Sequence, residues 1–290
     1  MPEFKVPSDI NNISIKDYLR RNVGLSLTTW RKVKQAGMLL INSMPALPYT
    51  LVRPNDIITV DWPNACTISP TAIQLDIKYE DEYLLIINKP PNMLVHPAKY
   101  NDTETLANAV IHYYNQHNMF FGFHPVHRLD RNTSGLVLVA KLPYIQHLLS
   151  KDVKTISRIY WGITEGTLTS PYGVINAPID RRPGSIIERI VCPTGQPAVT
   201  KYKIIETLQD ANLVELELET GRTHQIRVHM SYIGHPLLGD NLYGGSTQLF
   251  FRQALHAVRL CFNHPVTNKP IEVSTPPPED FHQVLLKLSY

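Results

Sequence analysis

The sequence has little cysteine, and its three residues (Cys66, Cys192 and Cys261) form no Cys-x-x-Cys pair. A zinc site or a disulfide framework needs closely spaced or paired cysteines, so neither is expected. The chain also lacks the apolar run of roughly 18 residues that a membrane helix requires. Its first five residues lack the apolar core of a signal peptide. These absences favour a cytoplasmic protein without a membrane segment.

Several common catalytic motifs are missing as well. The sequence contains no phosphate-binding loop, no Gly-x-Gly-x-x-Gly dinucleotide fingerprint and no Gly-x-Ser-x-Gly hydrolase elbow. It has twelve histidines but no His-Glu-x-x-His, and His224 and His229 are five residues apart without a cluster of acidic partners. We therefore expect neither a metal site nor a cofactor.

What the sequence does have is a locally concentrated positive charge. The whole chain carries +3, with a pI near 8.6. Between residues 13 and 34, six basic residues face one acid, Asp17, which gives +5 in that segment; the basic residues are Lys16, Arg20, Arg21, Arg31, Lys32 and Lys34. Such a cluster is either a solvated face of two helices or a surface that contacts phosphates.

The chain divides into two predicted domains. With 43% hydrophobic and 18% charged residues over 290 positions, it is long enough for two globular units. We predict a small domain over 1–65, a linker over 66–74 that contains Pro70, and a larger domain over 75–290.

The expected elements are short and mostly extended. In the first domain we expect a helix around Ile15 to Leu19, a second helix capped by Ser26, Thr28 or Thr29, and strands over 38–41 and 57–60. In the second we expect strands over 83–88, 136–140 and 213–219, and helices over 105–114 and 223–233. This pattern predicts an α+β fold with a largely antiparallel sheet.

A polar loop before the strand at 136–140 is the first candidate for chemistry. It runs from His127 to Gly135 and holds one acid, Asp130, among Arg128, Arg131 and His127. Neighbouring cations favour the ionised form of a carboxylate, which is the form that acts as a nucleophile. A turn in which Asp130 caps local amides explains the same spacing.

Two further segments carry candidate groups. In the predicted helix over 223–233, Thr223 shares a face with Arg227, and Gln225 shares one with His229, so its start could hold a phosphate or a carboxylate. Tyr160 could stack on a base. The alternatives are an ordinary surface helix and an aromatic residue in a strand core.

Taken together, these segments resemble the RluA-type pseudouridine synthases. The resemblance covers about residues 75–280 and is carried by four segments in the family's order; these are 87–97 (Ile-Asn-Lys-Pro-Pro-Asn-Met-Leu-Val-His-Pro), 127–136 (His-Arg-Leu-Asp-x-x-Thr-Ser-Gly-Leu), 158–160 (Arg-Ile-Tyr) and 219–229 (Glu-Thr-Gly-Arg-Thr-His-Gln-Ile-Arg-Val-His). Gly239-Asp240 and Tyr243-Gly244 follow in order. The first domain resembles an S-four-like RNA-binding domain, except that Ser43 stands where that domain usually has glycine.

The resemblance implies a reaction and its residues. An RNA uridine would be isomerised to pseudouridine without a cofactor, with Asp130 as nucleophile at C1′ or C6, Tyr160 stacked on the uracil and Arg227 paired with Asp130. Arg128 would help to flip the nucleotide out, and Leu136 and Ile226 would form apolar walls. Thr133, Arg222 and His224 would contact substrate, and Lys16, Arg20, Arg31 and Lys32 would contact RNA.

The resemblance also implies a partner, and two rival functions remain. The partner would be ribosomal or transfer RNA, with ribosomal RNA favoured by the extra domain, and the chain is expected to act as a monomer. A glycoside hydrolase would need a second carboxylate beside Asp130, which only Glu219 or Asp240 could supply. A non-catalytic RNA-binding protein with this fold is the other rival.

Overall fold

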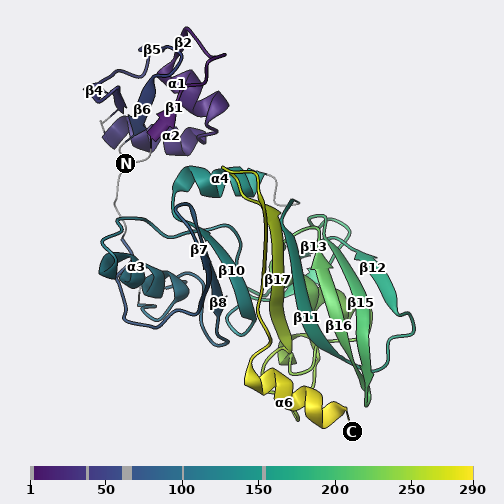
Figure 1. Ribbon diagram of the computed structural model, residues 1–290. Helices are drawn as coiled ribbons and strands as arrows, with labels where there is room; N and C mark the ends of the chain where they lie inside the picture. The colour runs from purple at the N-terminus through teal and green to yellow at the C-terminus, as the bar shows by residue number, and fades with distance from the viewer. Residues whose placement is uncertain (1–2, 37–38, 61–66, 100, 152–154, 290) are drawn as a thin grey trace.

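The computed structural model describes residues 3–36, 39–60, 67–99, 101–151 and 155–289 (Figure 1). Near the N-terminus, a four-stranded sheet has the order β1 (Glu3–Lys5), β6 (Ile57–Val60), β3 (Leu39–Ile41) and β4 (Met44–Pro45). A second small pair joins β2 (Ile13–Ser14) to β5 (Leu51–Val52). The helical segments of this part are α1 (Ile15–Asp17), the π-helical turn η1 (Tyr18–Asn22) and α2 (Leu27–Ala36).

Local chemistry explains the ends of these elements. The hydroxyl of Ser26 accepts a hydrogen bond from the Thr29 amide at 3.0 Å, which caps α2 as predicted. Asn42 and Ser43 form a two-residue turn between β3 and β4, with φ of 48° and 67°. Type I′ hairpin turns need positive φ at both central positions. Ser43 therefore adopts a left-handed backbone that glycine reaches without strain.

The larger part is built on one ten-stranded sheet. The order of its main path is β12 (Tyr172–Asn176), β15 (Val199–Leu208), β16 (Ala211–Leu218), β11 (Ser157–Glu165), β17 (Leu255–Asn263), β10 (Ser134–Ala140), β8 (Leu84–Lys89) and β7 (Ile77–Glu80). Beside this path, β18 (Pro270–Ser274) pairs with β17, and β9 (His124–Pro125) pairs with β10. Among the described strands of this sheet only β10 and β17 run parallel, so the predicted α+β fold with a mainly antiparallel sheet is confirmed.

The remaining elements surround this sheet. A separate hairpin joins β13 (Ile179–Arg181) to β14 (Arg189–Val191). Among the described residues of this part, the helical elements with assigned bounds are α3 (Leu106–Gln116), α4 (Pro143–Lys151), α5 (Gln225–Tyr232), the 3-10 turn η3 (Asn241–Tyr243) and α6 (Glu279–Leu288). The predicted strands over 83–88, 136–140 and 213–219 correspond to β8, β10 and β16, and the predicted helix over 105–114 corresponds to α3. The predicted strand over 38–41 corresponds to β3, although Met38 lies outside the described residues.

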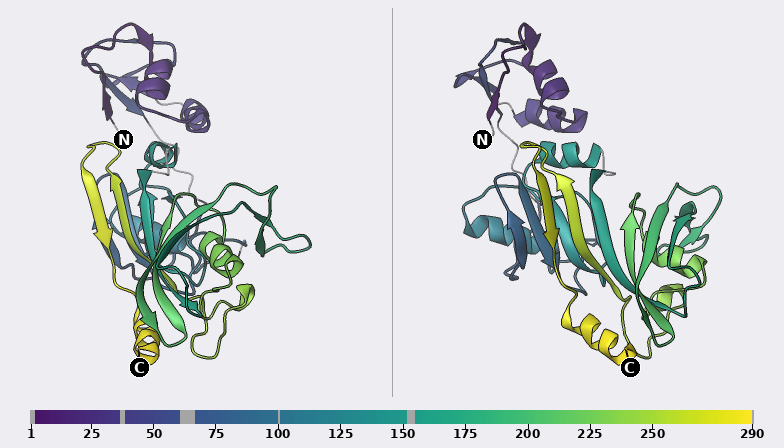
Figure 2. Two further views of the ribbon diagram at one scale, coloured as in Figure 1. Left: turned by 90° about the vertical axis from the view of Figure 1, so that its right-hand side faces the viewer. Right: turned by 45° about the vertical axis from the view of Figure 1, so that its right-hand side comes forward.

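The two faces of the sheet carry separate cores. Leu136 and Leu138 of β10 point to a core that also holds residues of α4, whereas Val137 and Val139 point to a core with α3 and α5. Strand residues alternate between faces, so a central strand with both faces covered is apolar throughout. Figure 2 shows this layering, with the N-terminal part beside α4.

The N-terminal part packs on the larger part through α4. The rings of Phe4 and Tyr144 meet edge to face, with centroids 5.3 Å apart. Buried residues of both parts, among them Trp30 and Leu149, belong to one continuous hydrophobic cluster. The segment 67–74 between the two sheets contains no strand or helix, and the domain boundary placed there stays a prediction. Within the described ranges, no helix is both long and apolar enough to cross a membrane.

Candidate active site

The Asp130 loop lies at the edge of a pocket of about 570 Å³. The loop connects β9 to β10, and the Thr133 amide donates to the Asp130 carbonyl at 3.1 Å, which closes a turn. Gly135 follows with φ of 112°, and a Cβ there would overlap the carbonyl oxygen of Ala257. Only glycine allows β10 to approach β17 this closely, and that contact places the loop beside the pocket.

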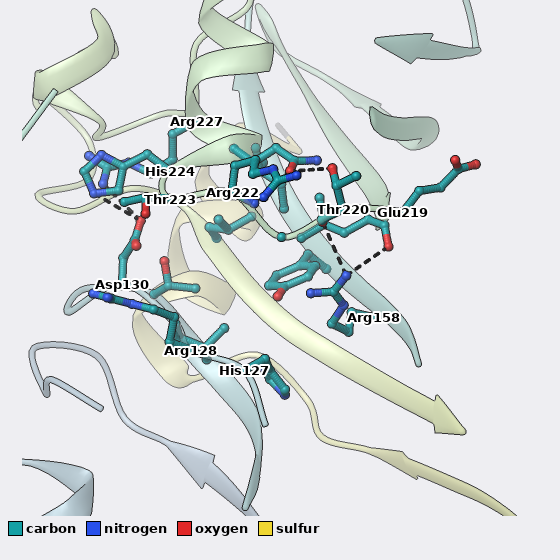
Figure 3. Close-up of a pocket in the computed structure, with 18 of the residues that line it drawn as sticks. His127, Arg128, Asp130, Arg158, Glu219, Thr220, Arg222, Thr223, His224 and Arg227 are labelled. Atoms are coloured by element: carbon teal, nitrogen blue, oxygen red, sulfur yellow. Dashed lines mark hydrogen bonds and ion pairs between the residues drawn. The ribbon is translucent and has the colours of Figure 1, made fainter. Parts of the chain in front are cut away.

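Asp130 is held by Arg227, as the resemblance implied. Arg227 Nη1 donates to Asp130 Oδ2 at 3.1 Å (Figure 3). On its other side, Arg227 donates to both carboxylate oxygens of Asp240, through Nε at 2.7 Å and Nη2 at 2.8 Å. Burial opposes the charge of Arg227, but the hydrogen bonds and charges of the two carboxylates outweigh it and raise its pKa. The guanidinium is therefore a fixed bridge between the two acids.

This bridge argues against a glycosidase arrangement. The side chain of Asp240 is 1% exposed, and both of its oxygens are bound to Arg227. A second catalytic carboxylate has to face the substrate or a water molecule. Glu219 lines the pocket but pairs with Lys201 at 2.7 Å. Neither acid that the sequence offered is thus placed as a general acid opposite Asp130.

The segment before α5 supplies the second group beside Asp130. His224 has a left-handed backbone, with φ of 57°, and its Nε2 lies 3.7 Å from Asp130 Oδ2. Its Nδ1 lies 2.7 Å from the hydroxyl of Tyr243, and that oxygen accepts from the Arg189 amide. The Tyr243 proton is then free to be donated to Nδ1. Burial lowers the pKa of His224, and the neutral ring carries its proton on the side of Asp130.

The helix prediction for this segment was partly wrong. Because His224 leaves the helical region, α5 begins at Gln225 and Thr223 lies outside it, so Thr223 and Arg227 do not share a helix face. The other predicted pair is confirmed, since Gln225 and His229 both contact the Thr200 hydroxyl, at 3.0 Å and 2.9 Å. These contacts anchor α5 to β15 and fix the direction of Arg227.

The expectation that Arg131 and His127 lie beside the Asp130 carboxylate as cations was wrong. Arg131 turns away and donates to the Asn92 side chain at 3.1 Å. His127 accepts from the Leu138 amide, and Arg128 lines the pocket with an exposed side chain. The turn that closes at Thr133 directs Asp130 toward α5 while Arg131 and His127 turn to other partners. The groups that contact the Asp130 carboxylate, Arg227 and the neutral His224, come from a segment almost a hundred residues later.

Tyr160 forms part of the pocket floor. It is 5% exposed, and burial is the main reason that its pKa is raised. The pairing of β11 with β17 shifts register between Ile159 and Tyr160. The extra residue is Val258 of β17, whereas β11 pairs with β16 without a shift, so Tyr160 keeps its regular strand orientation toward the pocket.

The apolar walls differ from the prediction. Ile226 lines the pocket as expected, and Leu129, Leu218 and Leu255 line it as well. Leu136 does not, because it lies on the opposite face of β10, in the core that includes α4. The prediction of Leu136 as a pocket wall was therefore wrong.

The other predicted contacts fall into two regions. Thr133, Arg222 and His224 line the pocket; Thr133 accepts from Gln253 and Arg222 donates to the Pro197 carbonyl. The basic residues of the N-terminal part are exposed on α1, η1 and α2 and are not among the pocket residues; they are Lys16, Arg20, Arg31 and Lys32. They form a separate surface.

Lys89 is a positioning residue that sequence analysis missed. It is 0% exposed at the end of β8, and its Nζ donates to the carbonyls of Pro90, Met93 and Arg131 at 2.8, 2.9 and 3.1 Å. The last bond ties the Asp130 loop to the loop after β8. The available signal was a lysine directly after a run of buried strand residues, where a charge is uncommon.

The buried His256 next to the site is expected to make the free energy of unfolding depend on pH. Burial lowers the pKa of His256 from 6.5 to about 4, while its Nδ1 accepts from Ser134 and its Nε2 donates to the Thr275 carbonyl. As pH falls from about 6.5 to about 4, His256 becomes protonated in the unfolded chain but stays neutral in the native chain. The free energy of unfolding therefore decreases in that pH range. We expect His256 to contribute a loss on the order of 3 kcal/mol.

Urea unfolding at pH 7.5 and at pH 5 checks this expectation. His256→Gln keeps a donor and an acceptor but does not titrate, so its free energy of unfolding should change less between the two pH values. An equal change in both proteins would show that His256 does not cause the dependence.

Comparison with known proteins identifies the family. The family model for RNA pseudouridylate synthase matches residues 83–232, a range that contains Asp130, Tyr160 and Arg227. The chain is 39% identical over 279 residues to the uncharacterized RNA pseudouridine synthase YjbO of Bacillus subtilis (strain 168), covering 94% of this chain and 98% of that protein.

Two other relatives agree with this match. The ribosomal large subunit pseudouridine synthase D of Haemophilus ducreyi is 41% identical over 239 residues, covering 76% of this chain and 73% of that protein. Among solved structures, human RNA pseudouridylate synthase domain containing 1 has a TM-score of 0.60 at 26% identity, covering 72% of this chain and 85% of that one. On the family model and these relatives, the chain belongs to the RNA pseudouridylate synthase family and is an RNA pseudouridine synthase.

Proposed function

We propose that Asp130 is the nucleophile of this pseudouridine synthase and that Arg227 positions it. The observation that carries the proposal is the 3.1 Å bond from Arg227 Nη1 to Asp130 Oδ2 in a pocket floored by Tyr160. The Asp240 carboxylate fixes the remote side of the same guanidinium. A carboxylate held in this way is aimed into the pocket, as a nucleophile requires.

The proposed chemistry uses this carboxylate at one of two carbons. Asp130 attacks C1′ of the ribose or C6 of the uracil, the bond from C1′ to N1 breaks, and the base turns. C5 then bonds to C1′, and the bond between the attacked carbon and the Asp130 carboxylate breaks, which frees the enzyme. The C5 proton leaves as N1 gains one, so the product is an isomer of the substrate. Tyr160 stacks on the uracil, its hydroxyl takes part in the proton transfer, and Arg128 helps to flip the nucleotide out.

We further propose ribosomal RNA as the substrate. Support comes from relatives at about 40% identity, several of which carry the name ribosomal large subunit pseudouridine synthase D. A ribosomal substrate predicts a cytoplasmic enzyme. We also expect it to act as a monomer.

Tritium release tests activity and substrate together. RNA labelled at uracil C5 is taken from cells that lack the gene, separated by size, and incubated with the enzyme. Each conversion frees one C5 hydrogen, so we expect release from the large ribosomal RNA fraction. Release from transfer RNA alone would overturn the ribosomal proposal. No release from any fraction by folded enzyme would favour a non-catalytic RNA-binding protein.

Residues 1–65 are proposed to form an S-four-like RNA-binding domain with its own phosphate contacts. The triple variant Lys16→Gln, Arg20→Gln, Arg31→Gln should bind RNA more weakly and with a smaller salt dependence. For single-stranded RNA, each lost contact lowers the slope of log K against log salt by about 0.7. Filter binding between 50 and 250 mM KCl measures that slope.

Substitution tests this surface better than deletion does. The core of the N-terminal part continues into the core around α4, so a truncated chain would expose buried residues. The matched control is Lys287→Gln, because Lys287 is exposed on α6. An unchanged slope in the triple variant would count against the RNA-binding role.

A further inference from the structure

Arg158 is a buried cation that has no carboxylate partner among the residues that the structure describes. Its side chain is 4% exposed in β11, and only the long bonds from Nη2 to the Leu218 and Thr220 carbonyls, at 3.5 and 3.3 Å, hold it. Its Nε is buried without any hydrogen-bond partner among the described residues. A buried charge that lacks a counter-charge is costly, so this one needs an explanation.

The two other well-buried arginines near the pocket show the contrast. Arg227 bridges Asp130 and Asp240. Arg252 donates from Nε and Nη2 to the two oxygens of Asp280, at 2.7 and 2.9 Å. Arg158 lines the same pocket as Arg227, yet no described carboxylate pairs with it. The missing partner is therefore expected to come from a ligand.

The space beside Arg158 is kept open by glycine. A Cβ at Gly221 would lie 2.7 Å from Arg158 Nη1. Figure 3 shows Arg158 near Thr220 and away from Asp130, which lies with His224 at the other end of the pocket. A group bound by Arg158 would thus not displace the base that Asp130 attacks.

His127 supplies a second free donor to this region. Its Nε2 accepts from the Leu138 amide at 3.2 Å, so the proton of the neutral ring lies on Nδ1, which is buried without a partner among the described residues. Burial, together with the nearby charge of Arg158, lowers the pKa of His127 to about 3 and keeps the ring neutral. Both residues line the pocket, and each has one buried N–H without a partner among the described residues.

The position of Arg158 indicates which part of an RNA it meets. It is two residues before Tyr160 on β11, so the two side chains lie on one face, roughly 7 Å apart along the strand. If the target uracil stacks on Tyr160, the neighbouring phosphate of the chain falls within reach of Arg158. A guanidinium fork matches two phosphate oxygens, and a phosphate supplies the counter-charge that a uracil carbonyl lacks.

We propose that Arg158 and His127 form a phosphate subsite that binds one backbone phosphate next to the flipped uridine. The inference rests on the proposed role of Asp130 and Tyr160, because those residues set where the uridine lies. The subsite fixes the register of the RNA in the pocket. Arg158 acts here as a binding residue.

A chemical double-mutant cycle tests the subsite. The ligand is a short RNA carrying the uridine mapped by tritium release, with the phosphate on either side replaced, one at a time, by a neutral methylphosphonate. Binding is measured in an Asp130→Asn background, with and without Arg158→Gln. We expect one replacement to raise Kd roughly tenfold to a hundredfold when Arg158 is present, and at most about twofold when it is absent.

The controls separate binding from folding and from the proposed function. Arg158→Lys keeps the charge and should keep the salt slope, whereas Arg158→Gln should lower that slope by about 0.7. Arg259→Gln removes an arginine that pairs with Glu215 and Glu272 outside the pocket, and should change neither quantity. If Arg158→Gln merely loosens the fold, it should raise Kd by the same factor for the unmodified RNA and for both methylphosphonate RNAs.

Two results would overturn the subsite. In the first, the methylphosphonates raise Kd by the same factors with and without Arg158. In the second, Arg158→Gln leaves both Kd and the salt slope unchanged. A separate measurement tests the proposed function: it fails if the wild-type enzyme releases no tritium. In that case a binding ligand is chosen from the RNA that the protein retains, and the same cycle decides the subsite.

Discussion

Replacement of Asp130 by asparagine is expected to lower tritium release by at least about 10⁴-fold, because the variant keeps the shape of the carboxylate but loses the nucleophile. RNA binding should persist, since a negative charge leaves a pocket that holds Arg128, Arg158 and Arg227. Single-turnover rates with saturating enzyme, together with Kd from filter binding, measure the two effects separately.

The fold should tolerate this change. Asp130 is partly exposed, and without it Arg227 retains both of its bonds to Asp240. The thermal midpoint should therefore stay within a few degrees of wild type. Asp180→Asn is a suitable control, because Asp180 is exposed in the β13–β14 hairpin. Equal turnover by wild type and Asp130→Asn would remove the nucleophile assignment.

Much of the fold was readable from local patterns. The run Leu84 to Ile87 and the run Leu136 to Ala140 are apolar, and both form buried strands. Thr105 caps α3 through a capping box with Asn108. The pairing of Arg227 with Asp130 came from the family resemblance, since spacing alone does not bring residues 97 positions apart together.

Other features depend on contacts that a single sequence does not encode locally. The orientation of Leu136 was not readable, because both faces of β10 are buried and its residues therefore show no alternation of polarity. The start of α5 was misplaced because His224 takes a left-handed conformation fixed by tertiary contacts with Tyr243 and Asp130. The fully buried side chain of Lys89 was missed since lysine is normally exposed.

Asp240 is the least exposed carboxylate of the site network, and its removal tests how that network is held. Its two bonds to Arg227 replace the hydration that both groups lose on folding. Removal of one partner from such a buried pair costs about 3–5 kcal/mol. Here it would leave Arg227 with only the single bond to the partly exposed Asp130. The chain contains a natural comparison, since Asp280 and Arg252 make the same bidentate contact with the carboxylate 44% exposed.

Asp240→Asn is therefore expected to lower the free energy of unfolding by about 3–5 kcal/mol, and Asp280→Asn by about 1 kcal/mol or less. Asp240→Asn should also reduce the single-turnover rate by a larger factor than it reduces RNA affinity, because Arg227 is then free to rotate away from Asp130. Urea unfolding and single-turnover assays below the unfolding transition measure both effects.

Equal losses of stability in the two variants would mean that burial does not strengthen the Asp240 contact. A fully active Asp240→Asn enzyme would mean that Arg227 is positioned by α5 alone.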